Sequence, residues 1–73
     1  MTNKELSALC MRYLLRTDDT AGPQLEAMYV DYEQDFMTTA DMAGHAELSL
    51  DLLEAALSYG KEVLEAKQGA SHV

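Results

Sequence analysis

Two side chains of this sequence have the chemistry of metal binding or nucleophilic catalysis, His45 and Cys10. His45 is the only histidine outside the C-terminal tail, with Asp41 one helical turn before it and Glu47 two residues after it. A structural or catalytic metal site needs three or four ligands, and no further ligand lies at a suitable spacing. We therefore predict that His45 lies on a helix surface and that the chain has no metal site.

Cys10 is the only cysteine, and it falls on the apolar face of the first predicted helix. A cysteine in such a position is usually a small buried hydrophobe. No candidate base lies near it in the sequence, as a nucleophile would require. Phosphate-binding glycine loops, dinucleotide-binding fingerprints and nucleophile elbows are also absent from the sequence. We predict a protein that is not an enzyme, with no catalytic residue and no cofactor.

The charge of the chain is uneven. Thirteen Asp and Glu stand against five Lys and Arg, which gives a formal net charge of −8, and residues 17–60 contain no Lys or Arg. Such a field attracts basic surfaces and repels nucleic acid and anionic membrane. We therefore expect a basic protein surface as the partner, rather than nucleic acid or a membrane. The alternative is an acidic face that only keeps the protein soluble.

Candidate partner-binding residues lie in the first half of the long helix predicted below, where acidic and apolar side chains alternate. In protein interfaces, charges mainly set the encounter rate, while a few buried anchors supply the affinity. Methionines adapt to more than one partner surface. The candidates are Met28, Val30, Asp31, Glu33, Asp35 and Met37. The alternative is that Met28 and Met37 pack against the first helix.

One heptad pattern of uncharged residues runs from Leu25 to Leu64 without a change of phase. This 3.5-residue period is typical of a coiled-coil seam. The large residues of this dimer or core seam are Leu25, Tyr29, Tyr32, Phe36, Leu50, Leu53, Leu57 and Leu64. Because the phase is kept, we predict one continuous helix over residues 23–67. The alternative, favoured by Gly44 and the β-branched pair at residues 38–39, is a break near Gly44 that makes a hairpin.

The seam also predicts which residues meet. If the stretch is folded or paired antiparallel about the Gly44–His45 bond, Tyr29 meets Gly60, and the other rings of the seam meet leucines. Each large ring then faces a smaller residue, as close packing requires. Two long helices from different chains and a hairpin within one chain give the same pairs.

The rest of the chain completes an all-α domain of residues 1–73. Thr2 and Glu5 form a capping-box pattern that begins a short helix over residues 3–16. A breaker cluster at residues 17–23, which holds the only proline, is expected to form a loop of about six residues before the long helix. Residues 68–73 are expected to be a frayed tail. The apolar arc of the C-terminal half exceeds half the helix circumference, so we predict that it is covered from two directions and that the protein is a homodimer.

The sequence also predicts a cytoplasmic, soluble protein. A single cysteine fits a reducing compartment, and the first residues contain no apolar segment typical of a secretory signal. No apolar run approaches the roughly 20 residues of a membrane span.

Two resemblances add to these expectations. Met1, Thr2, Glu5 and Met11, among other residues of the first helix, make the opening similar to that of the plasmid copy-number proteins. That family forms dimeric helical hairpins that bind paired RNA loops. The resemblance implies an alternative function as an RNA-binding regulator. The residues at the corresponding face include Cys10 rather than the polar and aromatic side chains with which the family reads RNA.

The small size, acidity and predicted helicity of the chain resemble the host-takeover inhibitors of temperate phages, of the anti-quorum-sensing type. That resemblance implies a phage-encoded inhibitor or anti-activator in the host cytoplasm. Such a protein blocks the DNA-binding domain of a host transcription regulator. A basic DNA-binding domain also suits the acidic charge. Beside this function and the RNA-binding alternative, in which Lys4, Arg12 and Arg16 are the contacts, a structural assembly subunit is a third possibility.

Overall fold

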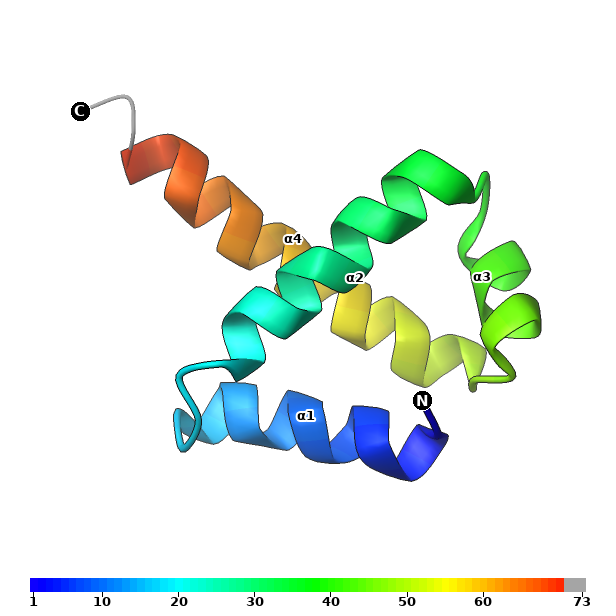
Figure 1. Ribbon diagram of the computed structural model, residues 1–73, viewed down its shortest axis with the longest axis horizontal. Helices are drawn as coiled ribbons and strands as arrows, with labels where there is room; N and C mark the ends of the chain where they lie inside the picture. Colours follow the sequence, from blue (N-terminus) through cyan, green and yellow to red (C-terminus); the bar gives the residue numbers. More distant parts are fainter. Residues whose placement is uncertain (71–73) are drawn as a thin grey trace.

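The computed structural model describes residues 1–70, which form four helices (Figure 1). These are α1 (Asn3–Leu15), α2 (Ala21–Asp35), α3 (Thr39–Ala46) and α4 (Leu50–Ala70). No strand occurs among the described residues. The predicted all-α class is confirmed, as is the short N-terminal helix. In the same part of the chain, no helix is long and apolar enough to cross a lipid bilayer.

Both ends of α1 are closed by local hydrogen bonds. The hydroxyl of Thr2 accepts from the Glu5 backbone N–H at 3.1 Å, and the Glu5 carboxylate accepts from the Thr2 N–H at 3.1 Å, which is the predicted capping box. At the other end Arg16 adopts the left-handed conformation, with φ 57°. The Arg16 and Thr17 N–H groups then donate back to the last turn of the helix.

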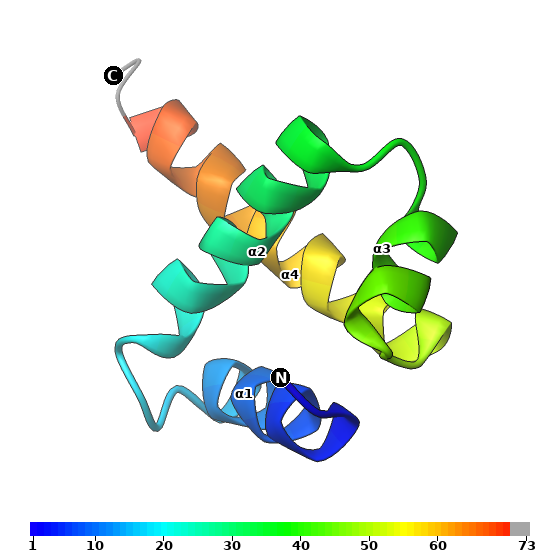
Figure 2. The ribbon, with the colours of Figure 1, turned by 45° about the vertical axis from the view of Figure 1, so that its right-hand side comes forward.

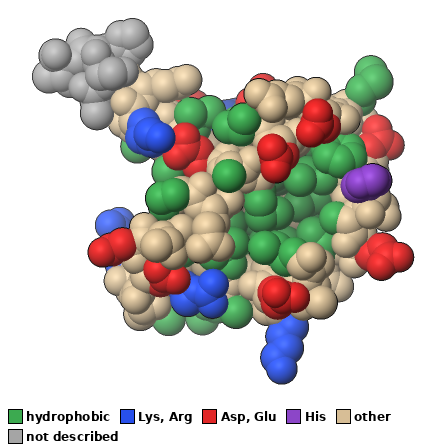
Figure 3. Space-filling model, in the orientation of Figure 1, with side chains coloured by type: hydrophobic (Ala, Val, Ile, Leu, Met, Phe, Trp, Pro, Cys, Tyr) green, Lys and Arg blue, Asp and Glu red, His purple; other side chains and the backbone are tan. Residues whose placement is uncertain are grey.

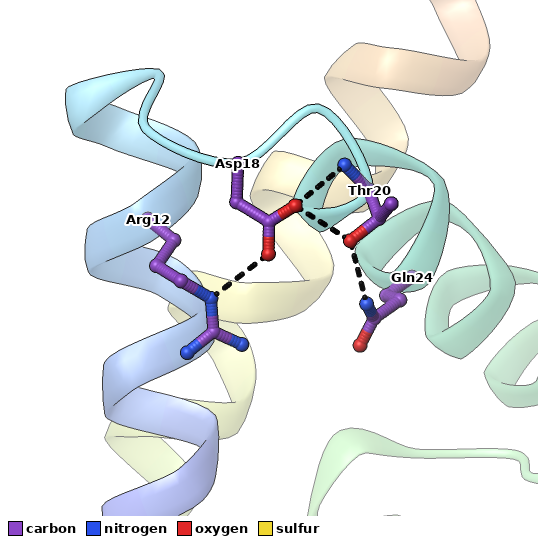
Figure 4. Close-up of polar contacts among 4 residues, drawn as sticks. All are labelled: Arg12, Asp18, Thr20 and Gln24. Atoms are coloured by element: carbon purple, nitrogen blue, oxygen red, sulfur yellow. Dashed lines mark hydrogen bonds and ion pairs between the residues drawn. The ribbon is translucent and has the colours of Figure 1, made fainter.

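Asp18 organises the turn between α1 and α2 (Figure 4). Its Oδ1 accepts hydrogen bonds from the Thr20 backbone N–H at 2.9 Å and from the Thr20 hydroxyl at 2.7 Å. Its Oδ2 lies 3.2 Å from Nε of Arg12 in an ion pair. These bonds to the charged form lower the pKa of Asp18, and the Thr20 hydroxyl is the largest cause. The five-residue turn is therefore held by one carboxylate.

The prediction of one continuous helix over residues 23–67 is wrong, because the chain leaves the helical conformation twice. The first break follows α2, where Phe36 and Thr38 both adopt extended backbone angles. The Thr38 hydroxyl then accepts from the Asp41 N–H at 3.1 Å and caps α3. A threonine at this position satisfies an amide that a continuous helix would have bonded internally, so a new helix begins at little cost.

The second break lies at residues 47–49. Glu47 is left-handed, with φ 58°, and the Leu48 N–H donates to the carbonyl of Ala43 at 2.9 Å in the pattern of a Schellman motif. Leu48 is buried, so the motif also points an apolar side chain into the core. The Ser49 N–H donates to Oδ1 of Asn3 at 2.7 Å, which joins the start of α4 to the start of α1.

The hairpin alternative agrees better with the course of the chain than one continuous helix does, but the break is not at Gly44 as that alternative predicted. Gly44 lies inside α3 and is exposed, so it is not the point of the break. The chain reverses through the whole of α3, which joins the end of α2 to the start of α4. The two breaks shorten the helices enough for α2 and α4 to pack within one chain.

The centre of the fold is the crossing of α2 over α4, seen in both ribbon views (Figures 1 and 2). Gly60 of α4 lies at this crossing. A Cβ atom at Gly60 would overlap the carbonyl oxygen of Leu25 and would lie 3.0 Å from Cβ of Tyr29. The predicted meeting of Tyr29 with Gly60 is therefore present in the structure. Only a residue without a side chain permits this backbone approach.

The core is made by all four helices and by Leu48 between α3 and α4. Its largest fully buried side chains are Leu6, Leu9, Leu25 and Leu53. The predicted seam residues belong mainly to this core. Leu25, Leu53 and Leu57 are buried, and Tyr29, Tyr32 and Phe36 are packed against them. Leu64 is half-buried, whereas Leu50 is 41% exposed.

The predicted tail begins as part of α4, which continues from residue 68 to Ala70. Residues 71–73 of that tail lie outside the described residues.

Candidate protein-binding surface

The six candidate partner-binding residues do not form one face of α2. Asp31 and Glu33 are two positions apart, and a helix turns by about 200° over two residues. Met28, Asp31 and Asp35 therefore lie on one flank at i, i+3 and i+7, while Val30 and Glu33 lie on the other. The three acids are all exposed, as predicted, but they point to different sides of the helix.

The flank with Glu33 already interacts with α4 of the same chain. Glu26 on this flank is only 15% exposed, and both its carboxylate oxygens lie 3.1 Å from Nζ of Lys67. The Glu33 carboxylate raises the pKa of Tyr29, because as a hydrogen-bond acceptor it favours the protonated hydroxyl. The negative charges of Glu33 and Glu65 add to this effect. Glu33 therefore has a role within the fold.

The flank with Asp31 and Asp35 contacts the core through Met28. Met28 is half-buried and packs against the core, so it is not a free anchor. The carboxylates of Asp31 and Asp35 have no such role and are exposed. This flank therefore offers a partner charge rather than apolar surface.

Met37 is the most exposed large hydrophobic residue described, with 91% of its surface accessible. It follows Phe36 in the first break, and the extended backbone there carries it away from the core. The alternative in which Met37 packs against the first helix is wrong. The sequence identified the residue, but its exposure depends on a break that the heptad pattern did not reveal.

Half-buried hydrophobic residues continue from α2 to α3. We define the α2–α3 surface by Met28, Asp31, Tyr32, Asp35, Phe36, Met37, Asp41, His45 and Ala46. The rings of Phe36 and His45 are 5.5 Å apart, so His45 lies on the helix surface, as predicted, but in contact with an aromatic neighbour. In Figure 3, hydrophobic side chains gather in the area enclosed by α1, α2 and α3, and carboxylates stand around it.

The outer face of α1 has the opposite character. Met11, Leu14 and Leu15 are 52%, 52% and 64% exposed. Residues 1–16 hold three of the five basic residues and one of the thirteen acidic ones, so they carry a formal +2 and leave −10 for the rest of the −8 chain. Apolar residues lie on two sides of this helix, and the structure buries only the stripe that contains Leu6, Leu9 and Cys10.

Cys10 is buried, as its place on the apolar stripe predicted. Burial raises the pKa of its thiol, because the thiolate would lose solvation. The protonated thiol is a poor nucleophile, so Cys10 acts as a core residue.

A depression lies beside the α1–α2 turn. Three of its lining residues carry carboxylates, two from the turn and one from α4. The lining residues are Tyr13, Leu14, Arg16, Asp18, Asp19, Gly22 and Glu62. This lining contains no serine, cysteine or histidine, so it offers no Ser–His or Cys–His pair for nucleophilic catalysis. Within residues 1–70, no three His, Cys, Asp or Glu side chains are placed together to hold a metal ion.

Comparisons with known proteins identify no relative. No model of a protein family matches the chain, no curated protein matches it, and no solved structure matches it.

Proposed function

We propose that this protein is a non-enzymatic inhibitor or anti-activator that binds a basic surface of another protein. Its acidic α2–α3 surface is the binding site in this proposal. A DNA-binding domain of a host transcription regulator, in the cytoplasm of a phage-infected cell, has the required charge. The supporting observation is the charge distribution, because residues 17–60 contain no Lys or Arg and include the whole of α2 and α3.

The division of α2 into two flanks narrows the contact residues. Asp31 and Asp35 are exposed on one flank, and Asp41 is exposed on α3. These charges attract a basic partner and set the salt dependence of association. Met37 supplies a flexible apolar side chain that a partner can bury. Val30 and Glu33, which lie on the other flank, are not required by this proposal.

The test is a comparison of two double charge reversals with the same change in net charge. Asp31→Lys/Asp35→Lys alters the proposed site, and Glu54→Lys/Glu62→Lys alters exposed acids of α4. A partner captured from host lysate at low salt is purified, and its association with each variant is measured at several salt concentrations.

We expect the first double reversal to slow association and flatten its salt dependence, while the second has a small effect. Equal effects of the two pairs would show that only net charge matters. A loss of binding confined to the α4 pair would place the site elsewhere.

The concentration of positive charge on α1 supports RNA binding as a second candidate function. Lys4 and Arg16 are exposed, whereas Arg12 is engaged with Asp18. A gel shift with bulk RNA and DNA separates the candidates, because only an RNA-binding regulator should retard nucleic acid. The homodimer predicted from the sequence is compatible with both candidates, and its contact surface is the subject of the next inference.

A further inference from the structure

We propose that the outer face of α1 binds the same face of a second copy of this chain, antiparallel, in a symmetric dimer. This inference does not rest on the proposed function. The predicted seam cannot serve as the contact, because its large residues mostly pack in the core of one chain. Four of the six large hydrophobic residues that are exposed in the described part of the chain lie in residues 1–15.

The exposed side chains form a helical stripe. Lys4, Ala8, Met11 and Leu15 are spaced at i, i+4, i+7 and i+11, so they lie on one side of α1, opposite the buried stripe. All four are exposed. A stripe with this three-and-four spacing is the kind that packs against another helix.

The stripe is complementary to itself when two copies run antiparallel. A pair centred between Ala8 and Met11 places Ala8 of each copy opposite Met11 of the other. The large side chain then faces the small one at both contacts, which close packing favours. At each end the alkyl part of Lys4 covers Leu15 of the second copy, while its ammonium group reaches water.

The same register pairs opposite charges. Glu5 and Arg12 lie on one flank of the stripe at i and i+7, and Glu5 is level with Leu14 of the second copy. The carboxylate therefore falls between Arg12 and Arg16 of the second copy, about 3 Å along the axis from each. Symmetry repeats this arrangement, so each copy gives one acid and receives one. Arg12 contacts Asp18 through Nε, and its terminal nitrogens point away from Asp18 (Figure 4).

Charge also favours this face over the others for self-association. The remainder of the chain carries a formal −10, so two copies repel each other through most of their surfaces. Docking of α1 onto the acidic α2–α3 surface of another copy would also pair opposite charges. That contact would be heterologous and would continue into larger assemblies unless its rotation closed a ring. The antiparallel pair stops at two.

The expected dimer is weak. The contact is made by one helix of thirteen residues, about 20 Å long, and interfaces below about 1,200 Å² are typical of transient association. The test is therefore sedimentation equilibrium over a concentration range from micromolar to millimolar, at low salt. We expect the mass to rise from 8.1 kDa toward twice that value and to stop there.

Met11→Asp should weaken the dimer by roughly tenfold or more, because it places a carboxylate against an apolar neighbour. Met37→Asp is the matched control, since Met37 is exposed on another part of the chain and should leave the dimer unchanged. Glu5→Gln keeps a side-chain oxygen for the capping box but removes the charge. It should weaken the dimer at low salt and have little effect at high salt.

Ala8→Cys/Met11→Cys gives a direct check of the register, because oxidation should cross-link the two copies. A mass of 8.1 kDa throughout the range would overturn the proposal. So would growth beyond a dimer, equal effects of Met11→Asp and Met37→Asp, or binding of α1 to anionic vesicles without self-association.

Discussion

Gly60 and Gly44 both lie inside helices, yet they belong to regions packed in opposite ways. Gly60 is buried where α2 crosses α4, and a Cβ atom there would overlap the backbone of Leu25. Gly44 is exposed on α3, and a Cβ atom there would meet nothing within 4 Å. The crossing therefore depends on the absence of a side chain, whereas α3 gains nothing from its glycine. The fold is specified tightly at the crossing and loosely along the connection.

The largest expected effect is at the crossing. Gly60→Ala should destabilise the protein by about 3 kcal/mol or more, because the helices must separate to admit the methyl group. Domains of this size have a free energy of unfolding of only about 5 kcal/mol, so we expect the variant to lose most of its stability. Circular dichroism and urea denaturation measure this. Native stability in the variant would show that the backbones are not in such close approach.

A second prediction compares two consecutive leucines of the predicted seam. Leu53 is fully buried, whereas Leu50, in the first turn of α4, is 41% exposed. Leu53→Ala should cost about 2–5 kcal/mol in the free energy of unfolding, and Leu50→Ala less than about 1 kcal/mol. Urea denaturation of both variants gives the difference. Similar costs would mean that Leu50 is covered in solution, by a second chain or by a different packing of α3.

These two residues show what the heptad pattern could predict. It identified Leu25, Tyr29, Tyr32, Leu53 and Leu57 but left out Met28, Leu52 and Tyr59, which also belong to the core of α2 and α4. The agreement arises because burial repeats with the helical period whether or not the helix is continuous. The pattern also identified the meeting of Tyr29 with Gly60. It did not reveal the breaks, which depend on a threonine cap at Thr38 and a left-handed Glu47, and neither residue is a strong stop signal.

The candidate binding residues were also predicted only in part. Their exposure followed from charge, and Asp31, Glu33 and Asp35 are indeed exposed. Their grouping on one face did not follow, since positions two apart on a helix face different sides. Met37 is exposed because it lies in the first break. Since the sequence did not reveal that break, it could not show whether Met37 is exposed or packs against a helix.

The connection offers a third, stabilising change. Glu47→Gly should raise the free energy of unfolding by up to about 1 kcal/mol, because glycine adopts the left-handed conformation at this position without steric cost.

Gly44→Ala should raise the free energy of unfolding by about 0.5–1 kcal/mol, because it removes backbone freedom from an exposed helical position. Thermal or urea denaturation checks both. A loss of stability in Gly44→Ala would show that Gly44 is not helical and exposed, and the contrast with Gly60 would then disappear.

The smallest expected effect concerns pH and a region outside both glycine sites, the α1–α2 turn. Asp18 has a lowered pKa in the folded state because the Thr20 hydroxyl and N–H donate to its carboxylate and Arg12 adds a positive charge. A lowered folded pKa means that the unfolded chain takes up the proton first. The stability from Asp18 is therefore present above the ordinary pKa of 3.8 and is lost as the pH falls through the lower folded pKa.

In Asp18→Asn, stability should fall less steeply below pH 3.8 than in the parent protein. Asp19→Asn, in the same turn, is the control for the loss of one negative charge. Urea denaturation at several pH values measures the slopes, and a parent slope in Asp18→Asn would show that the turn is not held by this carboxylate.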